Sequence, residues 1–125
     1  MDTGKLAISI TAAAFAGFGT ALIVKPEILG KIGIRARGAN ARTELRAMYG
    51  GMEIGFGVFF GIALQKPEWR TPALTAIACG IGALGVTRIA TAIAEQADPI
   101  SYLMAGPEIA ASTMAAVALV TDRRR

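Results

Sequence analysis

Three ionisable residues lie inside apolar stretches of this 125-residue chain, and they are the side chains that could do chemistry. They are Glu53, Arg88 and Glu108, each in a different stretch. A charged group within an apolar, membrane-length segment is costly to leave unpaired, and it usually faces the interior of a bundle. We therefore predict that the three side chains meet in one Glu53–Arg88–Glu108 cluster.

Two carboxylates around one guanidinium are compatible with several roles. They can hold three helices in register without any chemistry, they can form a polar pocket for a small or lipid-like ligand, or they can transfer protons. Arg46 can balance the excess negative charge from the membrane boundary, and Tyr49 can donate its hydroxyl from one turn before Glu53. No catalytic residue is assigned.

Other kinds of chemistry have little support in the sequence. There is no histidine, and Cys79 is the single cysteine, so neither a metal site nor an intrachain disulfide is expected. Residues 80–85 match the dinucleotide spacing G-x-G-x-x-G, but they lie within an apolar run with no strand before it. We expect no metal and no cofactor.

The composition is that of a membrane protein. Apolar residues make up 54% of the chain and charged residues 18%, with the charges clustered between apolar runs. A soluble domain of this size needs a more continuous polar surface. The net charge of +4 is accordingly interpreted as contact with anionic lipid headgroups, because aromatic residues are few. Membrane lipids are the expected partners, and nucleic acid is not.

Four apolar runs predict an all-α fold, an integral membrane four-helix bundle forming a single domain over residues 1–125. The predicted spans are about residues 5–24, 46–64, 72–93 and 100–120. The first run could instead be a signal peptide cleaved near Ala16. The apolar sequence continues for eight residues beyond that point, so a membrane-spanning helix is preferred.

Two further features concern the connections and the last span. Residues 25–46 alternate apolar and basic side chains, which favours a short amphipathic segment in the headgroup region, with a solvated connector as the alternative. Pro107 lies inside the fourth run. A helix beginning only there would be too short to cross, so we predict a helix from Pro99 or Ser101 that bends at Pro107.

The alternating direction of the spans places the three ionisable residues at one level. Glu53 is seven residues after Arg46, and Arg88 is five residues before the end of its span. Glu108 lies about as far into the fourth span, so each is about 8–10 Å from the same side. Small residues on the second span are predicted to let helices approach closely, namely Gly50, Gly51, Gly57 and Gly61.

The stretch ELRAMYGGME at residues 44–53 resembles a bacterial family of small four-helix membrane proteins within the broad DoxX-like group. The likeness covers nearly the whole chain, including the late arginine of the third span and Glu108. It implies a four-helix membrane fold and a role as an accessory subunit, assembly factor or cargo-binding protein. A more distant four-helix group, similar to sterol isomerases, uses intramembrane acids on a lipid-like substrate. The resemblance supplies no catalytic residues.

We therefore expect a non-catalytic accessory or lipid- or small-ligand-binding subunit. The alternatives are a membrane enzyme that uses paired carboxylates on a lipid-like substrate, and a proton-coupled transporter. Another membrane protein or a second copy of the chain is a further candidate partner. The expected location is the bacterial inner membrane. Both termini are placed in the cytoplasm because of the three arginines at residues 123–125, although six cations lie on each side of the predicted bundle.

Overall fold

The structure, a computed structural model, describes residues 2–122, and within that range it is built from helices. Four helical stretches are long and apolar enough to cross a membrane, and they confirm the predicted all-α, four-helix bundle. Their bounds are Thr3–Val24, Gly38–Gln65, Pro67–Ala94 and Pro99–Asp122.

The middle two stretches are interrupted helices, each with a single π-helical turn. The first stretch is α1 (Thr3–Val24), and the last is α6 (Pro99–Asp122), which continues through Pro107. The second comprises α2 (Gly38–Arg46), a π-helical turn (Ala47–Gly51) and α3 (Met52–Gln65). The third comprises a 3₁₀ turn (Pro67–Trp69), α4 (Arg70–Ala76), a π-helical turn (Ile77–Ile81) and α5 (Gly82–Ala94).

The connection from α1 to α2 contains the predicted amphipathic segment. It is a 3₁₀ helix (Pro26–Ile32) that buries Leu29 and exposes Lys31. Gly33 ends it with a φ of 85°, a left-handed conformation that glycine adopts without strain. Helical structure then resumes at Gly38, before the predicted start of the second span at Arg46, so the basic end of the linker is also helical.

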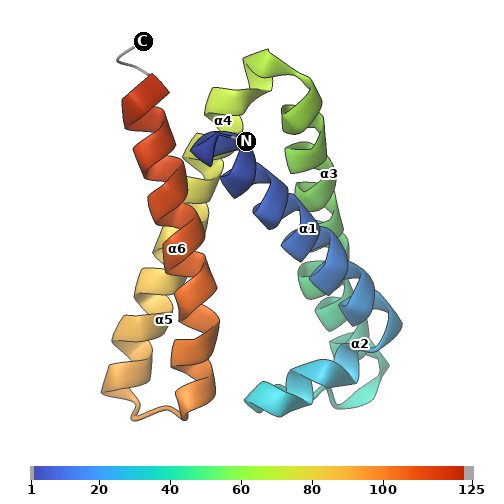
Figure 1. Ribbon diagram of the computed structural model, residues 1–125. Helices are drawn as coiled ribbons and strands as arrows, with labels where there is room; N and C mark the ends of the chain where they lie inside the picture. The colour runs from blue at the N-terminus through green and yellow to red at the C-terminus, as the bar shows by residue number, and fades with distance from the viewer. Residues whose placement is uncertain (1, 123–125) are drawn as a thin grey trace.

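The helices pack as two pairs that meet at one end of the molecule. α1 packs along α3, and α5 packs along α6. The pairs touch through α1 with α6 and through α4 with α1 and α3. Figure 1 shows that they come together where the N- and C-termini lie and separate toward the other end. We call these the closed end and the open end of the bundle.

The hydrophobic core lies at the closed end. Its buried side chains come from every span, and Phe60 is its largest member. Phe15 of α1 contacts the Phe60 ring edge-on, with 5.8 Å between the ring centroids. The remaining buried core residues are Ala7, Ile8, Ala63, Ala73, Leu74, Ile77, Ala115 and Ala118.

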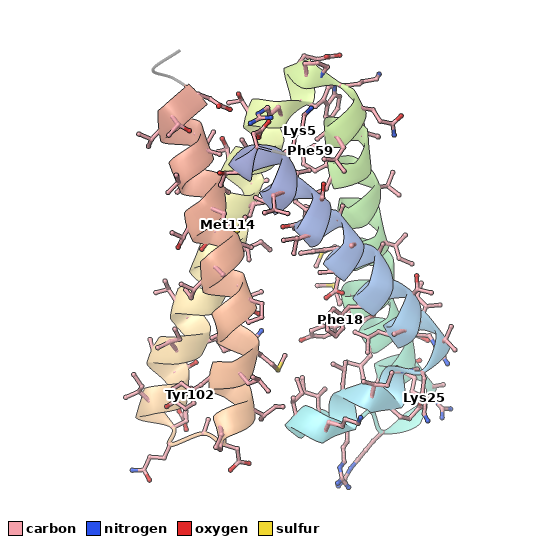
Figure 2. All side chains as sticks on the ribbon, in the orientation of Figure 1. Lys5, Phe18, Lys25, Phe59, Tyr102 and Met114 are labelled. Atoms are coloured by element: carbon pink, nitrogen blue, oxygen red, sulfur yellow. The ribbon has the colours of Figure 1, made fainter. Side chains whose placement is uncertain are left out.

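The same helix faces lose their packing partners toward the open end. Along one face of α3, Phe60 is 2% exposed, whereas Phe56, one turn away, is 41% exposed. Along one face of α1, Ala7 is fully buried and Phe18 is 64% exposed. Figure 2 shows Phe18 directed into the space between the α1/α3 pair and α6. Toward the open end, α1 and α3 therefore expose apolar side chains.

Candidate polar site at the open end

Arg88 and Glu108 form an ion pair between α5 and α6. The Arg88 Nη2 lies 2.7 Å from Glu108 Oε1, and Nε lies 3.0 Å from Oε2, so the guanidinium donates to both carboxylate oxygens. The two side chains are only 24% and 16% exposed, respectively. This fork-to-carboxylate geometry is the strongest form of a side-chain ion pair. Two of the three predicted cluster residues are thus in direct contact.

A glycine one turn from Arg88 makes this contact possible. A Cβ at Gly85 would lie 3.1 Å from Glu108 Cβ and 2.9 Å from Ile109 Cδ1, so a larger residue there would require these two side chains to shift. The short distance between the backbones lets the Arg88 side chain reach along α6 to the carboxylate. Pro107, directly before Glu108, does not interrupt α6.

Glu53 does not complete a three-membered cluster. Within residues 2–122 no ion pair joins Glu53 to a cation, and its Oε2 is buried without a hydrogen-bond partner. Glu53 lies on α3, one turn beyond Phe56 in the direction of the open end. α3 does not pack extensively on α5, the helix that carries Arg88. An unpaired carboxyl oxygen in such a place can accept a hydrogen bond from a bound molecule.

Arg46 is directed to another partner. Its Nε donates to the backbone carbonyl of Ile23, at 2.9 Å, near the C-terminal end of α1. An uninterrupted α-helix would place Arg46 and Glu53 on one face, because they are seven residues apart. The π-helical turn between them adds an extra residue to the helical repeat, which rotates Arg46 away from Glu53 and toward α1. Arg46 therefore satisfies a helix-end carbonyl and does not balance the carboxylates.

Tyr49 lies within the π-helical turn and is 40% exposed. No hydrogen bond of its hydroxyl, to Glu53 or to another group, is found in the described residues. The open end carries polar groups on both helix pairs.

The predicted packing glycines have different environments. A Cβ at Gly50 would meet the Ile23 side chain, and one at Gly57 would lie 3.0 Å from the backbone nitrogen of Ala16. A Cβ at Gly61 would meet nothing within 4 Å, and at Gly51 only a backbone atom of its own helical stretch, at 3.9 Å. Gly50 and Gly57 therefore allow α3 to approach α1, whereas Gly51 and Gly61 do not.

A shallow cavity of about 300 Å³ adjoins Arg88 at the tip of the α5/α6 pair. Its lining is mostly hydroxyl-bearing and charged, including Thr87, Thr91, Glu95 and Ser101. Arg88 thus borders a recess near the connection from α5 to α6 in addition to its contact with Glu108. No cluster of metal-binding side chains occurs among residues 2–122.

A second charged group, at the closed end, was not predicted from the sequence. Arg70 contacts Asp2 at 2.6 Å through Nη2 and Asp122 at 3.0 Å through Nε, so it ties both ends of the described chain to α4. The hydrogen bond from Arg70 holds the pKa of the Asp2 carboxyl well below its usual range. A Cβ at Gly4 would collide with the Arg70 guanidinium. The sequence does contain a signal for this contact, because Asp2, Arg70 and Asp122 have opposite charges and are expected at the same membrane surface.

Comparisons with known proteins identify a family but no function. No curated protein and no solved structure matches the chain. The model of one protein family, described as a domain of unknown function (DUF4345), matches residues 4–119, which include nearly all of the four helical stretches and every residue of the open-end site. The chain therefore belongs to the DUF4345 family.

Proposed function

We propose that this protein is a non-catalytic membrane protein that binds a lipid-like molecule at its open end, between the α1/α3 and α5/α6 pairs. The ligand's apolar part packs against the exposed rings of Phe18 and Phe56. Its polar group carries a hydrogen-bond donor, such as a hydroxyl or an amine, that reaches Glu53. The resemblance to DoxX-like accessory and cargo-binding proteins favours the same role, in a bacterial inner membrane.

The observation that carries this proposal is the unpartnered Oε2 of Glu53, one turn along α3 from the exposed apolar ring of Phe56. Buried polar atoms in folded proteins nearly always have a partner, so this one suggests a missing donor. Arg88 and Glu108, on the α5/α6 pair, bind each other, so Glu53 is the carboxyl that remains available as a hydrogen-bond acceptor. Apolar walls with few polar groups are typical of ligand sites.

The same carboxyl is the feature that favours a second candidate, acid–base chemistry or proton movement. A carboxyl without an ion-pair partner is available for proton transfer, whereas both oxygens of Glu108 accept hydrogen bonds from Arg88. As an enzyme, the protein would convert the bound amphipathic molecule chemically. As a transporter, it would move that molecule across the membrane in response to a proton gradient. Ligand binding without turnover is preferred because only one carboxyl is free.

Native mass spectrometry of the detergent-purified protein tests ligand binding. We expect a copurified amphipathic adduct on the unmodified protein and a several-fold lower occupancy in Glu53→Leu, because the acceptor is lost. The matched control is Glu68→Gln, which removes a carboxylate in the 3₁₀ turn at the closed end. Equal occupancy in all three proteins would contradict a site at Glu53.

Photolabelling distinguishes the site from general lipid contact. A diazirine-bearing long-chain alcohol should label the side chains of Phe18 and Phe56 more than that of the exposed Val58, which lies on the same helix as Phe56. Labelling of Val58 at the same yield would indicate annular lipid. Recovery of a chemically changed alcohol after incubation would favour the enzyme alternative.

A further inference from the structure

The linker between α1 and α2 forms a basic cavity that the proposed ligand site does not use. It has a volume of about 530 Å³, within the size range of small-molecule sites. Its walls come from the 3₁₀ helix Pro26–Ile32, from the residues after it and from α2. The residues that matter for its chemistry are Pro26, Glu27, Lys31, Ile34, Arg35 and Arg42.

The charged groups of this cavity are available for an anion. Lys31, Arg35 and Arg42 oppose a single carboxylate, Glu27, among its lining residues. Within residues 2–122 none of the three cations forms an ion pair or a side-chain hydrogen bond. Arginine donors fit phosphate oxygens in a forked geometry, and lysine adds a point charge. The lining therefore favours a phosphate-sized anion.

The position of the cavity indicates where that anion comes from. Pro26 lies two residues after the end of α1, so the cavity is at the level where a membrane-spanning helix leaves the hydrocarbon region. Lipid phosphates lie at this level, and basic residues there attract anionic headgroups. Pro26 and Ile34 add apolar surface that suits the glycerol and upper acyl chain of a lipid more than a free ion.

We propose that this cavity binds the phosphate headgroup of an anionic phospholipid. The two excess positive charges of the lining select a lipid with net negative charge, such as phosphatidylglycerol, over a zwitterionic one. Arg35 and Arg42 contact the phosphate, and Glu27 limits the affinity. The site is separate from Glu53 and does not depend on the function proposed above.

The test compares lipid binding by two double variants with the same loss of charge. Arg35→Gln/Arg42→Gln removes two lining cations, and Lys25→Gln/Arg37→Gln removes two exposed cations of the same linker that are not among the lining residues. Native mass spectrometry from micelles containing phosphatidylglycerol or phosphatidylcholine gives the bound fraction. We expect the first variant to lose about fivefold in phosphatidylglycerol affinity per cation removed, and the second variant to lose much less.

A variant that is expected to gain binding distinguishes loss of the site from misfolding of the protein. Glu27→Gln removes the carboxylate from the cavity and should raise phosphatidylglycerol binding several-fold, a result that a destabilised protein would not give. Binding of phosphatidylcholine should be nearly the same in all variants.

Three outcomes would overturn the proposal. Equal losses in the two double variants would mean that the linker attracts lipid only through its overall charge. Equal binding of both lipids would remove the selectivity for a net negative headgroup. Displacement of phosphatidylglycerol by millimolar inorganic phosphate, with saturable phosphate binding in the absence of lipid, would identify a free-phosphate site.

Discussion

The ion pairs of Arg88 and Arg70, at opposite ends of the bundle, are expected to contribute differently to the free energy of unfolding. Arg88 and Glu108 are mostly shielded, whereas Asp2 and Asp122 are 49% and 41% exposed around Arg70. Exposed pairs contribute little because water screens them and long side chains lose freedom. A shielded pair matters mainly through the penalty of leaving one partner alone.

Arg88→Met should therefore destabilise the protein in detergent. The substitution leaves Glu108 shielded and unpaired, which we expect to lower the free energy of unfolding by about 1–3 kcal/mol. Thermal melting followed by circular dichroism measures the change. Arg88→Met/Glu108→Met removes both charges and should recover most of the loss, since no unpaired group remains. A double variant as unstable as the single one would contradict this explanation.

Asp2 gives a prediction for pH. Its pKa is lowered in the folded state by the hydrogen bond from Arg70, so its contribution is present above the unfolded pKa, about 4, and is lost as the pH falls below that value. The difference in melting temperature between the unmodified protein and Asp2→Asn should be constant from about pH 7 to pH 5 and shrink below about pH 4. A difference that grows on acidification would show that Asp2 is not stabilised as a carboxylate.

At the scale of helices, the sequence predicted which segments are helical better than which way their side chains face. Hydropathy is a local property, so the four spans were predictable, and so was the level shared by Arg88 and Glu108. The hydrogen bond of Arg46 to Ile23 was not predictable. A helical repeat of 3.6 residues does not account for the extra residue of the π-helical turn Ala47–Gly51. No ion pair of Glu53 is found in the described residues, and no local feature of the sequence reports that the two helix pairs diverge.

Gly19 is a close-packing position that the sequence did not reveal, since it lies in a run rich in small residues. A Cβ there would be 2.8 Å from the Gly50 carbonyl oxygen and 2.9 Å from the Ile54 nitrogen, both backbone atoms that cannot move alone. Gly19→Ala should lower the free energy of unfolding by about 1–3 kcal/mol by forcing α1 and α3 apart.

Gly17 is the matched control because it is in the same helix, and a Cβ there meets nothing within 4 Å. Gly17→Ala should be neutral or stabilising by up to about 1 kcal/mol, through the higher helix propensity of alanine. Similar melting temperatures for Gly17→Ala and Gly19→Ala would contradict the close approach of α1 and α3.

At the scale of the whole molecule, the bundle has two chemically distinct ends. The closed end holds the core, the Arg70 network and both ends of the described chain. The open end holds the polar site, and the linker that contains the basic cavity also lies on that side of α1. Both proposed binding sites therefore belong to one membrane surface. The expected cytoplasmic location of the termini depends on residues 123–125, which lie outside the described residues.

Accessibility to a membrane-impermeant maleimide tests this arrangement in a Cys79→Ser background, which removes the native exposed thiol. Lys5→Cys and Lys66→Cys place a thiol at the closed end, and Arg37→Cys and Glu95→Cys place one at the open end. Since consecutive membrane-crossing helices alternate in direction, the first two should be labelled in one vesicle orientation and the other two in the opposite orientation. The sequence predicts that the cations other than Arg88 divide six against six between the two surfaces, so charge does not dictate which orientation that is. Labelling of Lys66→Cys and Glu95→Cys from the same side would mean that the third helical stretch does not cross the membrane, and Arg88 would then lose its place in a lipid-shielded site.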